Sequence, residues 1–283
     1  MPFASSTDAT VATVRAPSPS GFGVRLVSAL ILIPVALVEV VLGSPYFDVL
    51  VGLAGALIAW EWARLVGGGR LVPAGVVGIA AVLAATIGYS FLPAGWTFGV
   101  VVLGAVLTAA AAALRGGKPL WLGLGVLYAG LPCIAILWLR AAPPAGLATL
   151  LWLFALVWAT DTGAYFAGRT IGGPKLMPSV SPKKTWAGLA GGIVAAAAVG
   201  VVSGLLIDGA SPVFVAVASA VLAVVAQAGD LAESALKRHF GAKDSSRIIP
   251  GHGGVMDRVD GLVTVVLAVA LGSGLAGRTV VAW

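Results

Sequence analysis

The sequence predicts an all-α, polytopic integral membrane protein with about nine transmembrane helices and a cytoplasmic N-terminus. The first observation is the composition, because 59% of the 283 residues are hydrophobic and only 10% are charged. Such values exclude an ordinary soluble fold. The second is a series of apolar segments long enough to cross a bilayer, and the third is the alternation of basic residues between the loops that join them.

The chain divides into an N-terminal tail and one membrane domain. Residues 1–24 lack periodicity and are predicted to form a flexible cytoplasmic tail, and residues 25–283 a single transmembrane domain. The apolar segments of this domain are Leu26–Gly43, Val49–Ala63, Leu71–Tyr89, Phe98–Leu114, Leu120–Leu139, Leu147–Ala167, Gly188–Ile207, Val213–Leu236 and Leu262–Ala276.

The loops between these segments differ in charge. Starting with the tail inside, the inner segments hold 15 of the 17 Lys and Arg residues, and the outer ones hold only Arg140 and Arg278. Because basic residues stay on the cytoplasmic side, this alternation predicts nine crossings with the N-terminus in the cytosol. We expect the protein in the bacterial cytoplasmic (inner) membrane, with its chemistry facing the cytosol.

Small residues indicate close helix packing, and the single cysteine excludes stabilisation by disulfides. Gly188, Gly191 and Gly192 open an apolar helix and predict a close approach to a neighbour. Cys133 has no partner in the sequence, so disulfides and zinc clusters of cysteines are excluded.

Carboxylates are scarce, and their placement is informative. Six of the 11 acidic residues lie in or beside the last two inner loops, although an ionised carboxylate at membrane depth costs about 2.5 to 3.5 kcal/mol. Asp161 and Asp230 both lie within apolar segments. We therefore expect a wet, cation-bearing cavity on the cytosolic side.

The residues around Asp230 form one polar stripe. Asp230, Glu233, Ser234 and Lys237 are spaced as neighbours on one helical face. If a helix begins after Gly254, Asp257 and Asp260 share a face near its N-terminus, where free N–H groups suit phosphate.

This pattern favours a hard divalent cation together with phosphates. Magnesium is usually held by one or two carboxylates plus substrate phosphates, so Asp230 with Asp257, aided by Asp260, is a candidate site. The alternative is a set of interfacial salt bridges in which Lys237 and Arg258 neutralise the acids.

The preceding inner loop has a second basic cluster. Lys183 and Lys184 stand directly before a helix and beside Ser181, where they could bind phosphate as point charges. Paired lysines before a crossing are equally what membrane orientation requires, so this loop alone leaves both interpretations open.

The sequence resembles the phosphatidate cytidylyltransferase (CDP-diacylglycerol synthase) family. The resemblance rests on the 27-residue signature from Ser234 to Asp260, which includes Lys237-Arg238, Lys243-Asp244, His252-Gly253-Gly254 and Asp257-Arg258-Val259-Asp260. Asp161-Thr162-Gly163 and Ser181-Pro182-Lys183-Lys184-Thr185-Trp186 agree with it. The family commonly has an acid after this tryptophan, where this chain has Ala187, so no role of that acid is carried over.

The resemblance implies that CTP and phosphatidate react to give CDP-diacylglycerol and pyrophosphate. It also implies a magnesium requirement, with a second cation possible, a homodimer, and a site mainly within residues 161–261. The expected metal ligands are Asp230, Asp257, Asp260 and Asp161. The expected catalytic residues are Asp230, Lys237, Arg238, Asp257, Arg258 and Asp260, and the expected substrate-binding residues are Ser181, Lys183, Lys184, Ser234, Lys243, Asp244, His252, Gly253 and Gly254.

Two other functions fit the same residues. A CTP-dependent lipid kinase of the polyprenol type would transfer the terminal phosphoryl group to an alcohol and would need a base such as Asp161. A secondary anion transporter is less compatible, because such proteins place their binding groups near the bilayer midplane. CTP, phosphatidate and membrane lipids are thus the expected partners, and no nucleic acid is expected.

Overall fold

The computed structural model describes residues 20–249 and 253–277, and this part of the chain is almost entirely helical. Its elements are α1 (Ser20–Leu42), α2 (Tyr46–Val66), α3 (Pro73–Gly88), α4 (Ala94–Ala113), α5 (Pro119–Ala141), α6 (Gly146–Thr170), β1 (Lys175–Met177), β2 (Ser181–Thr185), α7 (Trp186–Leu206), α8 (Pro212–His239) and α9 (Met256–Ala276). The expected all-α class is confirmed, and each of the nine apolar segments corresponds to one helix.

Seven of these helices are long and apolar enough to cross a membrane: α2 and α4 to α9. Two described apolar stretches are shorter, the 16-residue α3 and residues Ile33–Leu42 of α1. The all-α membrane fold therefore stands, and the count of nine crossings remains a prediction. α1 begins at Ser20, before the expected end of the tail at residue 24, and residues 1–19 lie outside the described part.

Several helices extend past the apolar segments into polar sequence. α8 continues from Leu236 to His239, and α9 begins at Met256, six residues before the expected start at Leu262. Lys237, Arg238 and His239 occupy the last turn of α8, where positive charge is favourable next to the helix dipole. A prediction from hydropathy places the end of a helix where polar residues begin, but the helical backbone hydrogen bonds continue through these polar residues.

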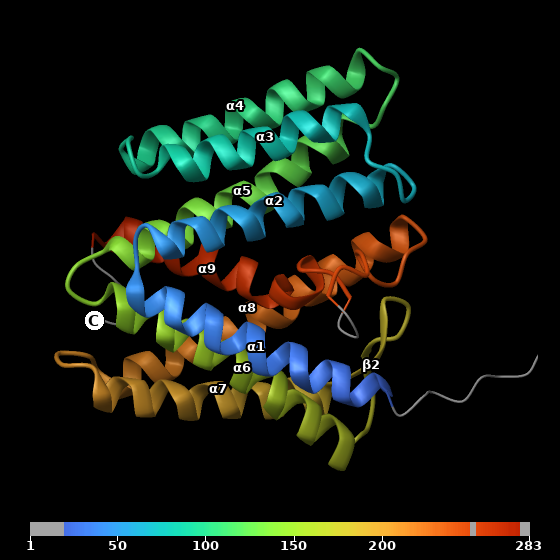
Figure 1. Cartoon of the computed structure of the whole chain (residues 1–283). Helices are drawn as coiled ribbons and strands as arrows, with labels where there is room; N and C mark the ends of the chain where they lie inside the picture. Colours follow the sequence, from blue (N-terminus) through green and yellow to red (C-terminus); the bar gives the residue numbers. More distant parts are fainter. Residues whose placement is uncertain (1–19, 250–252, 278–283) are drawn as a thin grey trace, which may run out of the picture.

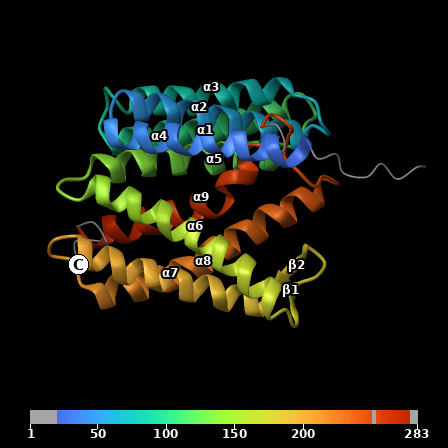
Figure 2. The same cartoon turned by 60° about the horizontal axis from the view of Figure 1, so that its bottom comes forward.

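The helices form two groups with α9 between them (Figures 1 and 2). α2 to α5 make one group, and α6 to α8 make the other, while α9 contacts α2, α5, α6 and α8. The loops α2–α3, α4–α5, α6–α7 and α8–α9, which carry most of the described Lys and Arg residues, lie at one end of the bundle (Figure 1). This common end is called the basic end below.

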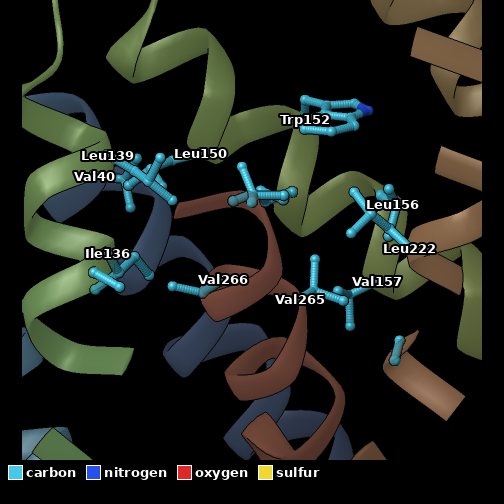
Figure 3. Packing of buried hydrophobic residues seen from close by; sticks show 14 of the residues in the cluster. Val40, Ile136, Leu139, Leu150, Trp152, Leu156, Val157, Leu222, Val265 and Val266 are labelled. Carbon is cyan, nitrogen blue, oxygen red and sulfur yellow. The ribbon is translucent and has the colours of Figure 1, made fainter. Parts of the chain in front are cut away.

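Buried side chains pack between the two groups. Figure 3 shows Leu139 of α5 beside Leu150 of α6, and Ile136 of α5 facing Val266 of α9. In the same view Leu156 of α6 lies beside Leu222 of α8. A second cluster fills the α2–α5 group. In a lipid environment van der Waals packing of this kind supplies the association between helices.

The glycines of α7 allow the close approach expected from the sequence. At Gly191 a Cβ atom would lie 2.8 Å from the carbonyl oxygen of Gly163 in α6, and at Gly192 it would lie 2.9 Å from that of Thr160. No side chain fits at these positions, so α6 and α7 are held backbone to backbone.

The loop between α6 and α7 is a two-stranded antiparallel hairpin. Lys175 pairs with Thr185, and Met177 pairs with Ser181. Thr185 ends the hairpin and also caps α7, because its Oγ1 accepts a 3.0 Å hydrogen bond from the backbone nitrogen of Gly188. This hairpin was not expected from the sequence.

Candidate active site

The acidic residues of the basic end lie in two connected networks. The first is centred on Asp257 in the first turn of α9. Its Oδ1 lies 2.6 Å from Nζ of Lys237, and its Oδ2 accepts hydrogen bonds of 2.9 Å from the backbone nitrogens of Ser245 and Gly254. The Ser245 hydroxyl is also 2.9 Å from Oδ2. This carboxylate therefore holds the α8–α9 loop against both helices.

Lys237 joins Asp257 to a second carboxylate. Its Nζ lies 2.9 Å from Oε1 of Glu233, one turn earlier on α8, and Glu233 also accepts a 2.9 Å hydrogen bond from the hydroxyl of Tyr128 on α5. Glu233 is only 2% exposed and Lys237 7%. A buried ammonium group between two carboxylates is compensated, and removing either partner would leave a buried charge.

Glu61 on α2 is fully buried and binds the end of the α8–α9 loop. Its carboxylate accepts hydrogen bonds from the backbone nitrogens of Val255 and Met256, at 2.8 and 2.7 Å. These groups belong to the N-terminus of α9, where backbone donors lack partners within the helix. The hydroxyl of Ser246 donates to Glu61 at 2.7 Å. Glu61 therefore positions the start of the helix that carries Asp257.

The glycines of the signature permit this packing. Gly253 has φ of +90°, a conformation that L side chains rarely adopt, and its carbonyl accepts a 2.9 Å hydrogen bond from Ile249. At Gly254 a Cβ atom would lie 2.5 Å from Oε1 of Glu61. The expected substrate-binding role of both glycines stays a prediction, whereas their structural role is visible. His252 lies outside the described residues.

The second network surrounds Asp230 and Asp161. Oδ2 of Asp230 is 2.6 Å from Nζ of Lys184 on β2, and Oδ1 accepts a 3.3 Å hydrogen bond from Ser234. Asp161 on α6 accepts a 3.5 Å hydrogen bond from Gln227. The polar stripe on α8 is thus confirmed, and its two ends serve different networks.

Electrostatic interactions connect the two networks. Asp260 interacts with Asp230 and Asp161, and also with Lys237. Arg258 on α9 and Lys184 both interact with Asp161. Asp161, Asp230 and Asp260 thus form a cluster of like charges that needs cations nearby.

A cavity of about 370 Å³ opens beside this cluster. Asp161, Asp230 and Lys184 line it together with Lys183, Arg169 and Gln227. The Lys184 Nζ is covered from solvent, whereas Lys183 is exposed. The two lysines therefore have different environments, which their adjacent positions in the sequence did not reveal.

The remaining described residues that the sequence predicted for the site lie outside the two carboxylate networks. Ser181 begins β2, and Lys243 and Asp244 line a separate cavity. Arg238 is exposed and donates a 3.2 Å hydrogen bond to the carbonyl oxygen of Ala242. Sequence reasoning missed the involvement of Glu61 and Tyr128, because both lie in apolar helices far from the signature.

These carboxylates could hold a magnesium ion only together with donors from outside the protein, such as the phosphates of a substrate. Within residues 20–249 and 253–277, no three His, Cys, Asp or Glu side chains are arranged to hold a metal ion. Mg²⁺ usually takes one or two carboxylates, several waters and substrate phosphates. Oxygen donors of the right chemistry are present, and Asp257 is already occupied by protein donors. Of the salt-bridge alternative, Lys237 pairs with Glu233 and Asp257 as expected, whereas Arg258 forms no salt bridge among the described residues. The pair of Lys184 with Asp230 was not part of that alternative.

Comparison of the sequence with known proteins shows the family to which this chain belongs. The sequence profile of the cytidylyltransferase family matches residues 23–273, a range that includes every candidate site residue named above. This chain belongs to the cytidylyltransferase family. The match also includes residues 23–140, which precede every motif on which the resemblance rests.

Several relatives in this family are phosphatidate cytidylyltransferases. The one from Pseudomonas aeruginosa is 38% identical over 256 residues, which cover 86% of this chain and 93% of the relative. The one from Haemophilus influenzae is 33% identical, covering 86% and 95%. The relative from Brucella suis is 52% identical over 143 residues, so this chain spans about half (53%) of its length in that match.

Proposed function

We propose that this protein transfers the cytidylyl group from CTP to phosphatidate, giving CDP-diacylglycerol and pyrophosphate. The observation that carries the proposal is the arrangement of four aspartates around two lysines at the basic end of a membrane bundle. Asp230 pairs with Lys184 and Asp257 with Lys237, while Asp161 and Asp260 interact electrostatically with these lysines. The family and the names of the relatives support the same reaction.

The reaction requires charge neutralisation more than proton transfer. The attacking group is a phosphate monoester whose second pKa is near 6, so at neutral pH it is largely dianionic and needs no base. Its oxygen attacks the α-phosphorus of CTP, and the bond to the pyrophosphate oxygen breaks. Lys184, Lys183 and Arg258 would hold the two polyanions together and in line.

Magnesium belongs to the proposal as a cofactor. When bound, it would neutralise charge on the triphosphate and on the pyrophosphate leaving group. Asp230 and Asp257, with Asp260 and Asp161, are the proposed ligands, and a second cation is compatible with four carboxylates. Lys237 would then serve as the counter-charge that keeps Asp257 in place.

The orientation and assembly are also proposals. We propose nine crossings in the bacterial inner membrane, with the N-terminus and the basic end in the cytosol, and a homodimer. Single cysteines placed at Gly116 and Asp208 in a Cys133→Ala background test the orientation. An impermeant maleimide should label position 116 only in inverted vesicles and position 208 only in right-side-out vesicles; the reverse result would contradict it. Light scattering of the purified protein tests the dimer.

The reaction is tested by following the base of the nucleotide. Purified protein receives CTP labelled in the cytosine ring, together with phosphatidate and magnesium. Label in the lipid is the expected result. Label that remains in CDP while an alcohol lipid becomes phosphorylated would indicate the kinase, and proteoliposome uptake without pyrophosphate release would indicate a transporter.

A further inference from the structure

A second cavity at the basic end includes Lys243 and Asp244, two of the expected substrate-binding residues, and is not yet assigned to either substrate. It measures about 380 Å³ and is lined by Arg64, Lys243, Asp244, Ser246 and Arg247. Arg64 lies in the last turn of α2, and the other four belong to the α8–α9 loop. Every lining residue is charged or carries a hydroxyl group, and three cations face one carboxylate.

The three cations of this cavity share one carboxylate, Asp244, and lack close ion pairs among the described residues. In the described part of the chain, neither arginine nor Lys243 forms a salt bridge. Arg64 is nevertheless held in place, because its Nε donates a 3.0 Å hydrogen bond to the carbonyl of Gly69 and its guanidinium lies 4.7 Å from the centre of the Trp60 ring. Like charges around one cavity repel each other, so an anion with several negative charges would stabilise the arrangement.

The cavity adjoins the first carboxylate network. Ser245 donates to Asp257, while the next residue, Ser246, lines the cavity and donates to Glu61. Arg64 follows Glu61 by three positions and so lies one turn further along α2. Two consecutive loop residues therefore connect this cavity to the Asp257 network.

The chemistry of the lining selects a soluble polyanion. No lining residue has an apolar side chain, so the cavity would contact an acyl chain only through the aliphatic carbons of its polar side chains. The cavity beside Asp230 differs, because Tyr165 and Leu189 contribute to its lining and α6 and α7 expose Phe166 and Trp186 nearby. A phosphate on a membrane lipid suits that cavity better.

We propose that the cavity of Arg64, Lys243 and Arg247 binds the triphosphate of the nucleotide, and that Arg64 and Arg247 are binding residues for it. Guanidinium groups match phosphate oxygens in a bidentate manner, which favours arginine at such a site. This inference rests on the proposed function. It adds two residues to that function and assigns the triphosphate to the side of the α8–α9 loop, while the lipid phosphate stays beside Asp230.

Two variants and a matched control test the inference. Arg64→Gln and Arg247→Gln each remove one charge from the cavity, and Arg70→Gln removes one from an exposed residue of the α2–α3 loop that does not line it. The KM values for CTP and phosphatidate are measured separately in purified protein. Calorimetry with inorganic tripolyphosphate measures binding without turnover.

Each cavity variant should raise the KM for CTP about tenfold and weaken tripolyphosphate binding about tenfold, the effect of losing one charge-assisted hydrogen bond. The KM for phosphatidate should stay within about twofold of wild type, as should all values for Arg70→Gln. Arg247 is exposed, so its variant tests the proposal even if Arg64→Gln fails to fold.

Two results would overturn the inference: a rise in the KM for phosphatidate alone, or cavity variants that behave like Arg70→Gln. Failure of the proposed function looks different. Wild-type protein would then form no cytidylylated lipid, and tripolyphosphate binding would still report whether the cavity holds a polyanion.

Discussion

The carboxylate of Glu61 lies 2.7 Å from the backbone nitrogen of Met256, a residue 195 positions away in the sequence. This contact joins α2 to the first turn of α9, directly before Asp257. It makes the N-terminal helices part of the candidate site, although every residue of the family signature lies in the C-terminal half.

Replacing Glu61 should therefore loosen the site as a whole. Glu61→Gln replaces one acceptor oxygen by an NH₂ group that faces backbone N–H donors, so we expect the free energy of unfolding to fall by about 2–3 kcal/mol and turnover to fall with it. Glu39→Gln is the control, because Oε2 of Glu39 has no hydrogen-bond partner in the described residues. Equal thermal shifts in the two variants would show that Glu61 does not anchor the loop.

Asp257 should be required for both turnover and loop stability. The sequence alone predicts that Asp257→Asn removes nearly all turnover and leaves folding and membrane insertion intact. In the structure both carboxylate oxygens accept from donors, so an amide must direct its NH₂ toward one of them, and we expect an added loss of about 1–3 kcal/mol in unfolding free energy. Wild-type activity of this variant across magnesium concentrations would refute its proposed role as a metal ligand.

Asp230→Asn should lower turnover with little loss of stability, unlike Asp257→Asn, which should lower both. Asp230 contacts only Lys184 and Ser234 at hydrogen-bond distance among the described residues, so turnover should be lost with a smaller change in unfolding free energy than for Asp257→Asn. Asp208→Asn, an exposed carboxylate in the α7–α8 loop, controls for loss of one charge. Turnover close to wild type in Asp230→Asn would remove Asp230 from the metal site.

The pair Lys184–Asp230 should show measurable coupling. A double-mutant cycle with Lys184→Gln and Asp230→Asn should give a coupling free energy of about 1 kcal/mol in unfolding, because both side chains are partly buried. Lys183→Gln is the control, since Lys183 is exposed and forms no ion pair within the described residues. Additive effects of Lys184→Gln and Asp230→Asn would mean that the ion pair does not hold the hairpin over the cavity.

Close packing of α6 and α7 should be needed to position Asp161. At Gly163 a Cβ atom would lie 2.6 Å from Ala195 Cβ and 2.6 Å from the carbonyl oxygen of Gly191, so Gly163→Ala should cost about 1–3 kcal/mol of unfolding free energy and lower turnover. Gly99→Ala, in α4 with nothing within 4 Å, should be neutral or stabilising. The expectation fails if the melting temperatures of the two variants coincide.

The helices, the polar stripe from Asp230 to Lys237 and the position of most basic residues could be predicted from the sequence. These features depend on local hydropathy, helical spacing and charge counts. Tertiary structure alone decided that Lys184 and not Lys183 pairs with Asp230, that Asp257 is held by Lys237 and Ser245, and that Glu61 caps α9. Such contacts join residues up to 195 positions apart, and only the packing of helices brings their atoms within hydrogen-bond distance.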